Sequence, residues 1–268
     1  MTIKQWHQTT ALTKELAAVA KQEEKLLRAA QKAKPLQWKK DLESKLPAHV
    51  ASGLESAFCK GFSAVFRQGK TVIEKGYDKE SLKADYDIRN FAVQRKGGRK
   101  ELRQMHKSAK KSDFLNLAVT TAEGIGLGAL GIGMPDIVLF LGTLLKGIYE
   151  TALHYGYDYD TRQEQLLILK MMETALCHGE DWVRRNEEVN QMLILETVDI
   201  TQEDFRQQLE KTASVFAMDM LLLKFVQGLP LIGILGGAAN PVYYRKVLQY
   251  VQLKYRKRYL LQQKEKLP

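Results

Sequence analysis

The side chains best placed to do chemistry are two carboxylates set in apolar runs, Asp136 and Asp219. A carboxylate among apolar residues must be hydrogen-bonded, paired or protonated, and of these two only Asp136 is a candidate functional acid. Asp136 also has a structural interpretation, because it follows Pro135 and would lie in the first turn of a helix, where free N–H groups favour an anion. Both interpretations of Asp136 stay open. Asp219 is predicted to pair with Lys211, Lys224 or solvent.

Two patterns typical of cofactor sites are also present. Residues 126–131 read GLGALG and fit GxGxxG, and Glu150 follows nineteen residues later, as in a dinucleotide-binding fingerprint. That fingerprint requires a preceding strand, whereas residues 126–131 lie in a helical context.

Glu150 and His154 share a helix face, and Cys177 and His178 could add metal ligands. A hydrogen-bonded pair of Glu150 and His154, or their exposure to solvent, is favoured over a metal site. We therefore predict no cofactor and no metal.

The elements that must position these residues are helices, because apolar residues recur at helical spacing along almost the whole chain. The sequence predicts an all-α protein, a single multi-helix bundle. Glycines at 53, 61 and 69, spaced by eight, indicate close approach of a neighbouring helix, and Thr201 and Asp204 have a spacing close to a capping box. Helices are expected at residues 9–33, 50–73, 82–93, 99–123, 135–155, 162–177, 180–195, 201–227 and 242–263.

Two glycine-rich apolar segments, called elbows here, interrupt the helical pattern at residues 124–134 and 228–240. The 22 residues from 124 to 145 hold one ionisable group, Asp136, so they are long enough to span a membrane. A carboxylate near the middle of a span costs about 2.5–3.5 kcal/mol. We therefore expect the first elbow to lead into a helix buried in protein. Residues 1–34 are predicted to form a separate amphipathic helix before a domain at 35–268.

Charge is distributed unevenly along the 268 residues, whose net charge is +10. Residues 1–113 hold 25 Lys and Arg against 13 Asp and Glu, residues 114–240 hold 8 against 17, and residues 241–268 hold 8 against 1. Basic ends around an acidic middle indicate one or two positive surfaces for an anionic partner. The first residues carry charge throughout and do not resemble a secretion signal, and the two cysteines do not form a CxxC pair. A cytoplasmic location is expected.

The last predicted helix alternates tyrosines with basic residues, a composition typical of a helix at a membrane surface. Nucleic acid would also suit it, because tyrosines stack on bases. The third interpretation is a terminal helix whose tyrosines pack on the domain while its lysines face water. Replacing residues 256–258 with glutamate is expected to abolish lipid binding and leave melting nearly unchanged. The predicted membrane contacts are Arg245, Lys246, Lys254, Arg256, Lys257 and Arg258.

Three segments together resemble the EcsC family: MPDI at 134–137, TALHYGYD at 151–158, and PLIGILGGAAN at 230–240 followed by the basic helix. The resemblance covers roughly residues 45–260, and Met134 and Ile137 depart slightly from the family pattern. It implies a bacterial protein linked to membrane transport, with no established catalytic mechanism. The positions that it singles out are Gly128, Gly131, Asp136, Tyr155, Gly156, Asp158, Pro230, Gly233, Gly237 and Asn240.

We therefore expect a peripheral protein at the inner face of the membrane, accessory to a transport system or regulating it. Its partners would be an anionic membrane surface and a membrane transporter. The alternative is a hydrolase acting on lipid or peptide, with Asp136, Tyr155, Asp158 and Asn240 as candidate functional residues and Gly128, Gly131, Gly156, Gly233 and Gly237 as structural glycines. Nucleic-acid binding is the least favoured class. The sequence leaves open whether the protein is an enzyme and what its oligomeric state is.

Overall fold

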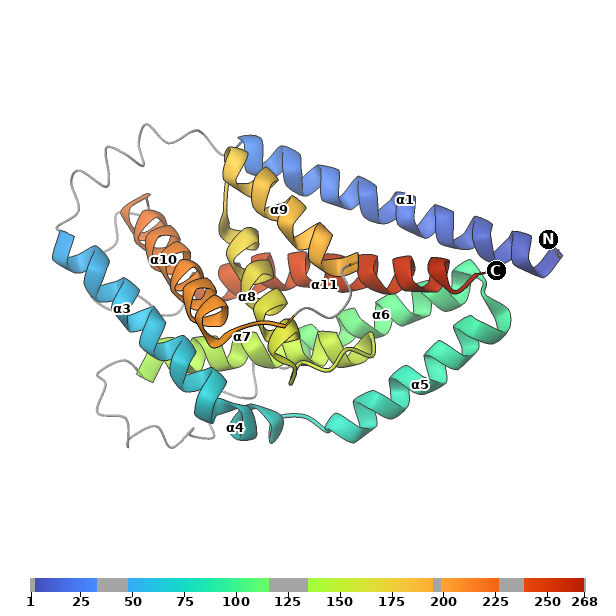
Figure 1. Cartoon of the computed structure of the whole chain (residues 1–268), viewed down its shortest axis with the longest axis horizontal. Coiled ribbons are helices and arrows are strands. Elements are labelled where there is room, and N and C mark those ends of the chain that lie inside the picture. The colour runs from blue at the N-terminus through green and yellow to red at the C-terminus, as the bar shows by residue number, and fades with distance from the viewer. Residues whose placement is uncertain (1–2, 33–47, 116–134, 195–198, 227–238, 268) are drawn as a thin grey trace.

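The computed structural model describes residues 3–32, 48–115, 135–194, 199–226 and 239–267 (Figure 1). Within these ranges every regular element is helical, which confirms the all-α prediction. The elements are α1 (Ile3–Lys32), α3 (Ala48–Ala64), the π-helical turn η1 (Val65–Gly69), α4 (Lys70–Glu74), α5 (Lys79–Lys96), α6 (Arg99–Leu115), α7 (Pro135–His154), α8 (Arg162–Leu176), α9 (Gly179–Ile194), α10 (Gln202–Val226) and α11 (Ala239–Glu265).

The centre of the bundle is α11, which Figure 1 shows running through the molecule between α1 on one side and α6 and α7 on the other. It packs against α1, α7, α8 and α9. Tyrosines and aliphatic residues on all sides of it are buried, among them Val247, Tyr250, Val251 and Tyr255. A helix buried all round belongs to a core and not to a surface. Ala11, Leu12 and Val19 of α1 join the same core.

The helix after Pro135 is buried in protein, as the sequence predicts. In α7, Leu141, Leu144 and Ile148 have no exposed surface. Its segment Ile137–His154 is long and apolar enough to cross a membrane, and 89% of that segment is buried inside the protein. The two elbows lie outside the described residues, except for the helical residues 239 and 240 at the end of the second.

Glycines let two helices approach α7 closely. A Cβ at Gly61 of α3 would lie 2.8 Å from Ile137 Cγ2, and one at Gly147 of α7 would lie 2.6 Å from the Tyr244 hydroxyl of α11. Of the three glycines spaced by eight, only Gly61 faces another helix so closely. A Cβ at Gly53 would meet no atom within 4 Å, and one at Gly69 would meet only Val65 and Ile73 of the adjoining turns.

Helix ends follow the capping chemistry of the sequence. Asp78 accepts a hydrogen bond from the Ser81 N–H at the start of α5, and Gly97 ends that helix with a φ of 60°, so α5 is longer at both ends than the predicted 82–93. Thr161 caps α8 through the Glu164 N–H. Thr201 and Asp204 exchange hydrogen bonds at the start of α10, which confirms the predicted capping box.

Gly156, one of the predicted structural glycines, has a φ of 79°, and a Cβ there would collide with the ring of Tyr86. We expect Gly156→Ala to lower the free energy of unfolding by about 1–3 kcal/mol for the left-handed backbone, and further for the displaced ring. Gly53→Ala is the matched control, because Gly53 is exposed within α3. It should raise the free energy of unfolding by about 0.5–1 kcal/mol. Urea denaturation measures both variants, and equal changes in their free energies of unfolding would contradict the role given to Gly156.

Candidate functional site

The candidate residues around the first elbow do not all fall within the described side chains. Asp136 and Asn240 belong to helical backbone at the starts of α7 and α11, but their side chains lie outside the described residues. Gly128, Gly131, Pro230, Gly233 and Gly237 lie outside them entirely. The hydrolase interpretation depends on Asp136 and therefore stays a prediction.

The described candidates lie in the turn between α7 and α8 and face different ways. Tyr155 is buried, and its hydroxyl lies 3.1 Å from His106 Nδ1. Asp158 is exposed, and its Oδ1 accepts a hydrogen bond from the Asp160 N–H at 3.0 Å. Gly156 permits the left-handed turn between them. Tyr155 thus belongs to the core and Asp158 to the turn, so the two side chains do not converge on one site.

Most of the predicted membrane contacts are inside the fold, and this corrects the interpretation of the last helix. The side chains of Lys254 and Arg256 are 0% and 7% exposed, because α11 is the central helix. Lys257 and Arg258 are largely buried as well. These four cations are therefore unavailable to a membrane in this conformation. Of the six predicted membrane contacts, only Arg245 is exposed, and Lys246 is half-buried.

Three glutamates hold these cations, and two of the three come from α1. Glu23 accepts hydrogen bonds from Lys254 Nζ at 2.5 Å and Lys257 Nζ at 2.8 Å. Burial alone would raise the pKa of Glu23, but the two lysines outweigh it and lower the pKa to about 2. Burial also lowers the pKa of Lys254, to about 8. Asn186 and Asn190 of α9 complete the cluster by donating to Glu23.

The other two glutamates repeat the arrangement. Glu15 of α1 is 2% exposed and accepts from Arg256 at 2.5 Å, and from Arg99 and Arg103 at the start of α6. Glu164 of α8 pairs with Arg258 at 2.7 Å and accepts from the Tyr255 hydroxyl at 2.7 Å. These four cations of the last helix are therefore neutralised internally by acidic residues from distant parts of the chain.

Positive charge remains exposed at one end of the molecule, where the N-terminal part of α1, the α5–α6 turn and the C-terminal part of α11 meet (Figure 1). We call this region the basic end. One hollow there is lined by Lys14, Lys96 and Arg99, and another by Arg99, Lys100, Arg103 and Lys107. Arg99 is common to both hollows, so the positive surface is continuous. On α1 and around the α5–α6 turn, the exposed cations of the basic end are Lys14, Arg95, Lys96, Arg99, Lys100, Arg103 and Lys107.

Helix geometry explains why these cations gather. Gly97 turns the chain between α5 and α6 in the left-handed conformation, so the basic last turn of α5 directly precedes the basic start of α6. Arg99 and Arg103 pair with Glu15. The remaining five, Lys14, Arg95, Lys96, Lys100 and Lys107, have no carboxylate partner among the described residues.

Exposed apolar side chains lie beside these cations. Phe91, Ile88 and Trp6 are 62%, 69% and 56% exposed. The Arg95 guanidinium lies 5.8 Å from the centre of the Phe91 ring, and Ile88 lines one hollow together with Lys107. Trp6 packs against His7, which lines another hollow with Lys14. A surface that combines cations with exposed aromatic and aliphatic groups suits an interface between water and lipid.

The sequence indicated one or two positive surfaces at the ends of the chain but did not place one at the start of α6. The excess of basic residues over positions 1–113 was the sequence feature that indicated this positive surface. The sequence did not reveal that Glu15 and Glu23 pair with cations of α11, because those partners are more than two hundred residues apart in the chain.

Asp219 of α10 has a partner that the sequence did not predict. It accepts a hydrogen bond from His178 Nε2, just before α9, at 3.2 Å, and the described residues show no ion pair with the predicted Lys211. Burial alone would raise the pKa of Asp219, yet His178 and Lys246 lower it. Lys224 has no described side chain. His178 is thus a hydrogen-bond partner of Asp219 within the fold.

The predicted hydrogen-bonded or exposed pair of Glu150 and His154 is also wrong. Both residues are buried on α7, at 2% and 5% exposure, and neither ring nitrogen of His154 has a hydrogen-bond partner among the described residues. Glu150 lies 3.9 Å from Lys146 instead. Within the ranges that the structure describes, no three His, Cys, Asp or Glu residues come together to hold a metal ion.

The buried His154 predicts a pH effect. Burial, with Arg89, lowers its pKa from 6.5 to about 4, although Asp85 opposes the change. Since the unfolded chain binds this proton more readily, stability should fall as pH drops from about 6.5 to about 4, by about 3 kcal/mol in total. Urea denaturation between pH 7 and pH 4 measures this loss. His154→Phe should remove that part of the pH dependence, whereas His49→Gln, at an exposed histidine of α3, is the matched control. The same slope in His154→Phe as in the unmodified protein would refute the assignment.

The model of the EcsC protein family matches residues 10–260. The match extends further toward the N-terminus than the resemblance at 45–260 and includes most of α1, in agreement with the ion pairs that join α1 to α11. No curated protein and no solved structure matches the chain. Because the family model covers nearly all of its residues, the chain belongs to the EcsC protein family.

Proposed function

We propose that the protein binds an anionic membrane surface through its basic end, as a peripheral protein at the inner face of the membrane. The observation that carries the proposal is the set of five exposed cations without a carboxylate partner among the described residues: Lys14, Arg95, Lys96, Lys100 and Lys107. This surface replaces the last helix as the proposed contact.

The expected strength of binding follows from the number of cations. Each basic side chain near an anionic leaflet contributes about 1 kcal/mol, so five contribute about 5 kcal/mol, or roughly a thousandfold or more in affinity. This attraction is screened by salt, over a Debye length of about 10 Å at 0.1 M. Binding should therefore weaken steeply as ionic strength rises.

Phe91, Ile88 and Trp6 favour lipid over nucleic acid as the partner. Aromatic rings and cations together would also suit a single-stranded nucleic acid, but an exposed isoleucine has no plane on which to stack a base. It does have apolar surface to bury in acyl chains. The side chains of all three are more than half exposed and so are free to insert.

The biological role that we propose is that of an accessory or regulator of a membrane transport system, in a bacterial cytoplasm. Support for the transport link is the family resemblance alone. Hydrolysis remains the alternative function, although no described candidate residues converge on a catalytic site.

Flotation with lipid vesicles tests the proposal. Vesicles of phosphatidylglycerol and phosphatidylcholine should carry the protein upward in a density gradient at low salt, and vesicles of phosphatidylcholine alone should not. Raising the salt concentration to 0.5 M should release it. Failure to float with the anionic vesicles at low salt would refute the proposed function. A gel-shift assay with single-stranded DNA, matched in salt, tests nucleic acid as the other partner.

A further inference from the structure

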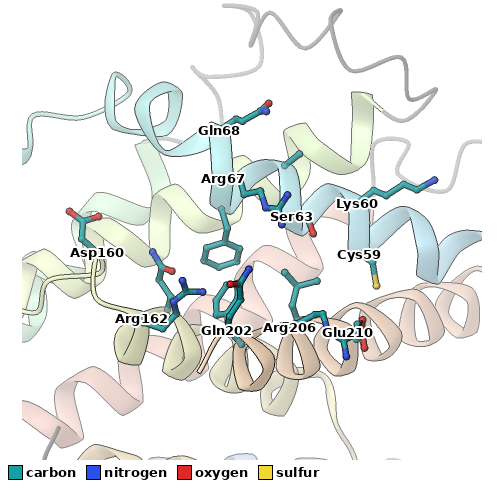
Figure 2. Close-up of a pocket in the computed structure, with 15 residues that line it drawn as sticks. Cys59, Lys60, Ser63, Arg67, Gln68, Asp160, Arg162, Gln202, Arg206 and Glu210 are labelled. Carbon is teal, nitrogen blue, oxygen red and sulfur yellow. Dashed lines mark hydrogen bonds and ion pairs between the residues drawn. The ribbon is translucent and has the colours of Figure 1, made fainter. Parts of the chain in front are cut away.

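A cavity of about 880 Å³ lies away from the basic end, between α3 with η1 on one side and the starts of α8 and α10 on the other (Figure 2). In Figure 2, Cys59, Ser63 and Arg67 come from the upper helix, and Arg162, Gln202 and Arg206 come from the helices below. A cavity of this size can hold a small organic molecule.

One wall of the cavity is aromatic. Phe66 of η1 and Phe205 of α10 meet edge to face, with ring centres 5.5 Å apart, and Leu209 continues the apolar surface. The Arg162 guanidinium lies 5.3 Å from the centre of the Phe205 ring. The wall therefore offers apolar contact area directly beside a cation.

The charged groups of the cavity leave an excess of positive charge. Its two carboxylates are already paired, Asp160 with Lys70 and Lys79, and Glu210 with Arg206. Lys60, Arg67 and Arg162 line the cavity as well, and none of the three forms an ion pair within the part of the chain that the structure describes. An anion entering the cavity would thus meet cations that have no internal counter-charge.

Two helix starts and a π-helical turn form the backbone around the cavity. The helices α8 and α10 both start there, with Arg162 and Gln202 as their first residues. On the opposite side, the π-helical turn places three consecutive residues, Phe66, Arg67 and Gln68, in the cavity lining. Such turns occur frequently at functional sites.

We propose that this cavity binds an organic phosphate, with the phosphate held by Arg67 and Arg162 and the apolar or aromatic body against Phe66 and Phe205. A planar guanidinium matches a phosphate through two parallel hydrogen bonds, and the aromatic wall is too apolar for a free inorganic ion to use. The shared chemistry fits both an alkyl phosphate from lipid and a nucleoside monophosphate.

Isothermal titration calorimetry distinguishes these sources with three probes: octyl phosphate, adenosine monophosphate and inorganic phosphate. We expect one of the two organic phosphates to bind at least ten times more tightly than inorganic phosphate, and its identity assigns the source. Absence of binding by both would overturn the proposal. Inorganic phosphate binding as tightly as either would also overturn it, because the aromatic wall would then contribute nothing.

Variants locate the binding. Arg67→Gln combined with Arg162→Gln should weaken the organic phosphate at least tenfold without lowering the melting temperature, because both side chains are exposed. Lys83→Gln, at an exposed lysine of α5 outside the cavity, is the matched control and should bind normally. Unchanged affinity in the double variant would refute the cavity as the site. The double variant is expected to float with anionic vesicles as the unmodified protein does. The proposal for the cavity and the proposal for the basic end can therefore be refuted independently of each other.

Discussion

Replacing Glu23 with glutamine is expected to lower the free energy of unfolding by about 3–5 kcal/mol, the range measured when one partner of a buried ion pair is removed. The glutamine has nearly the same shape, so packing is preserved while the counter-charge is lost. Lys254, whose side chain is 0% exposed, would then be buried without a negative partner, and Lys257 would lose its own partner. Urea denaturation at pH 7 measures the loss.

The neighbouring Glu24 provides the matched control. It pairs with Arg28 on the exposed face of the same helix, with side chains 53% and 69% exposed. Exposed pairs contribute little, so Glu24→Gln should change stability by less than about 0.5 kcal/mol. A double change, Glu23→Leu with Lys254→Met, should recover much of the lost stability, because apolar residues can replace a buried pair. If Glu23→Gln is as stable as Glu24→Gln, the buried cluster does not stabilise the fold.

Reversing the charge of Lys96, Lys100 and Lys107 to glutamate is expected to abolish binding to anionic vesicles. Each reversal removes about 1 kcal/mol of attraction and adds repulsion of similar size. Three reversals therefore cost about 6 kcal/mol, more than the total proposed for the basic end. All three side chains are exposed and unpaired within the described residues, so melting should be nearly unchanged. Flotation at low salt, alongside thermal melting, measures both quantities.

A second triple variant separates local from overall charge. Lys21, Lys25 and Lys211 are exposed outside the basic end, and reversing them changes the net charge by the same amount. This variant should still float. If both triple variants lose binding equally, net charge and not the basic end governs the interaction. Reversal of residues 256–258 is expected to unfold the protein, in contrast to the expectation from sequence, because it would place glutamates beside Glu15, Glu23 and Glu164.

The helices were predictable because their signals are local. Pro135 starts α7, Thr161 caps α8, and Gly156 occupies the left-handed turn between them, and each of these features depends on a few adjacent residues. The burial of the helix after Pro135 was also predictable, since a lone carboxylate in an apolar run argues against lipid. The π-helical turn within the second long helix was not, because nothing in residues 65–69 differs from an ordinary helical pattern.

Four of the six membrane contacts predicted on the last helix are buried, and the sequence could not show this because composition does not reveal partners. Tyrosine beside lysine and arginine has the same pattern whether the cations face phosphate groups or carboxylates of the same chain. Glu15 and Glu23 look like ordinary polar residues of an amphipathic helix, and only the packing of α1 on α11 turns them into buried counter-charges. The cavity lining likewise joins residues near 65, 162 and 205, so no local pattern could indicate it.

The pairing of α1 with α11 has a consequence for synthesis. In chain order α1, which supplies the acids, comes well before α11, which supplies the bases and the central wall of the bundle. Until α11 leaves the ribosome, the emerging chain holds Glu15 and Glu23 without their main partners and several helices without the surface on which they pack. The bundle therefore cannot close around its core before α11 has emerged, and shorter intermediates should be clients of chaperones.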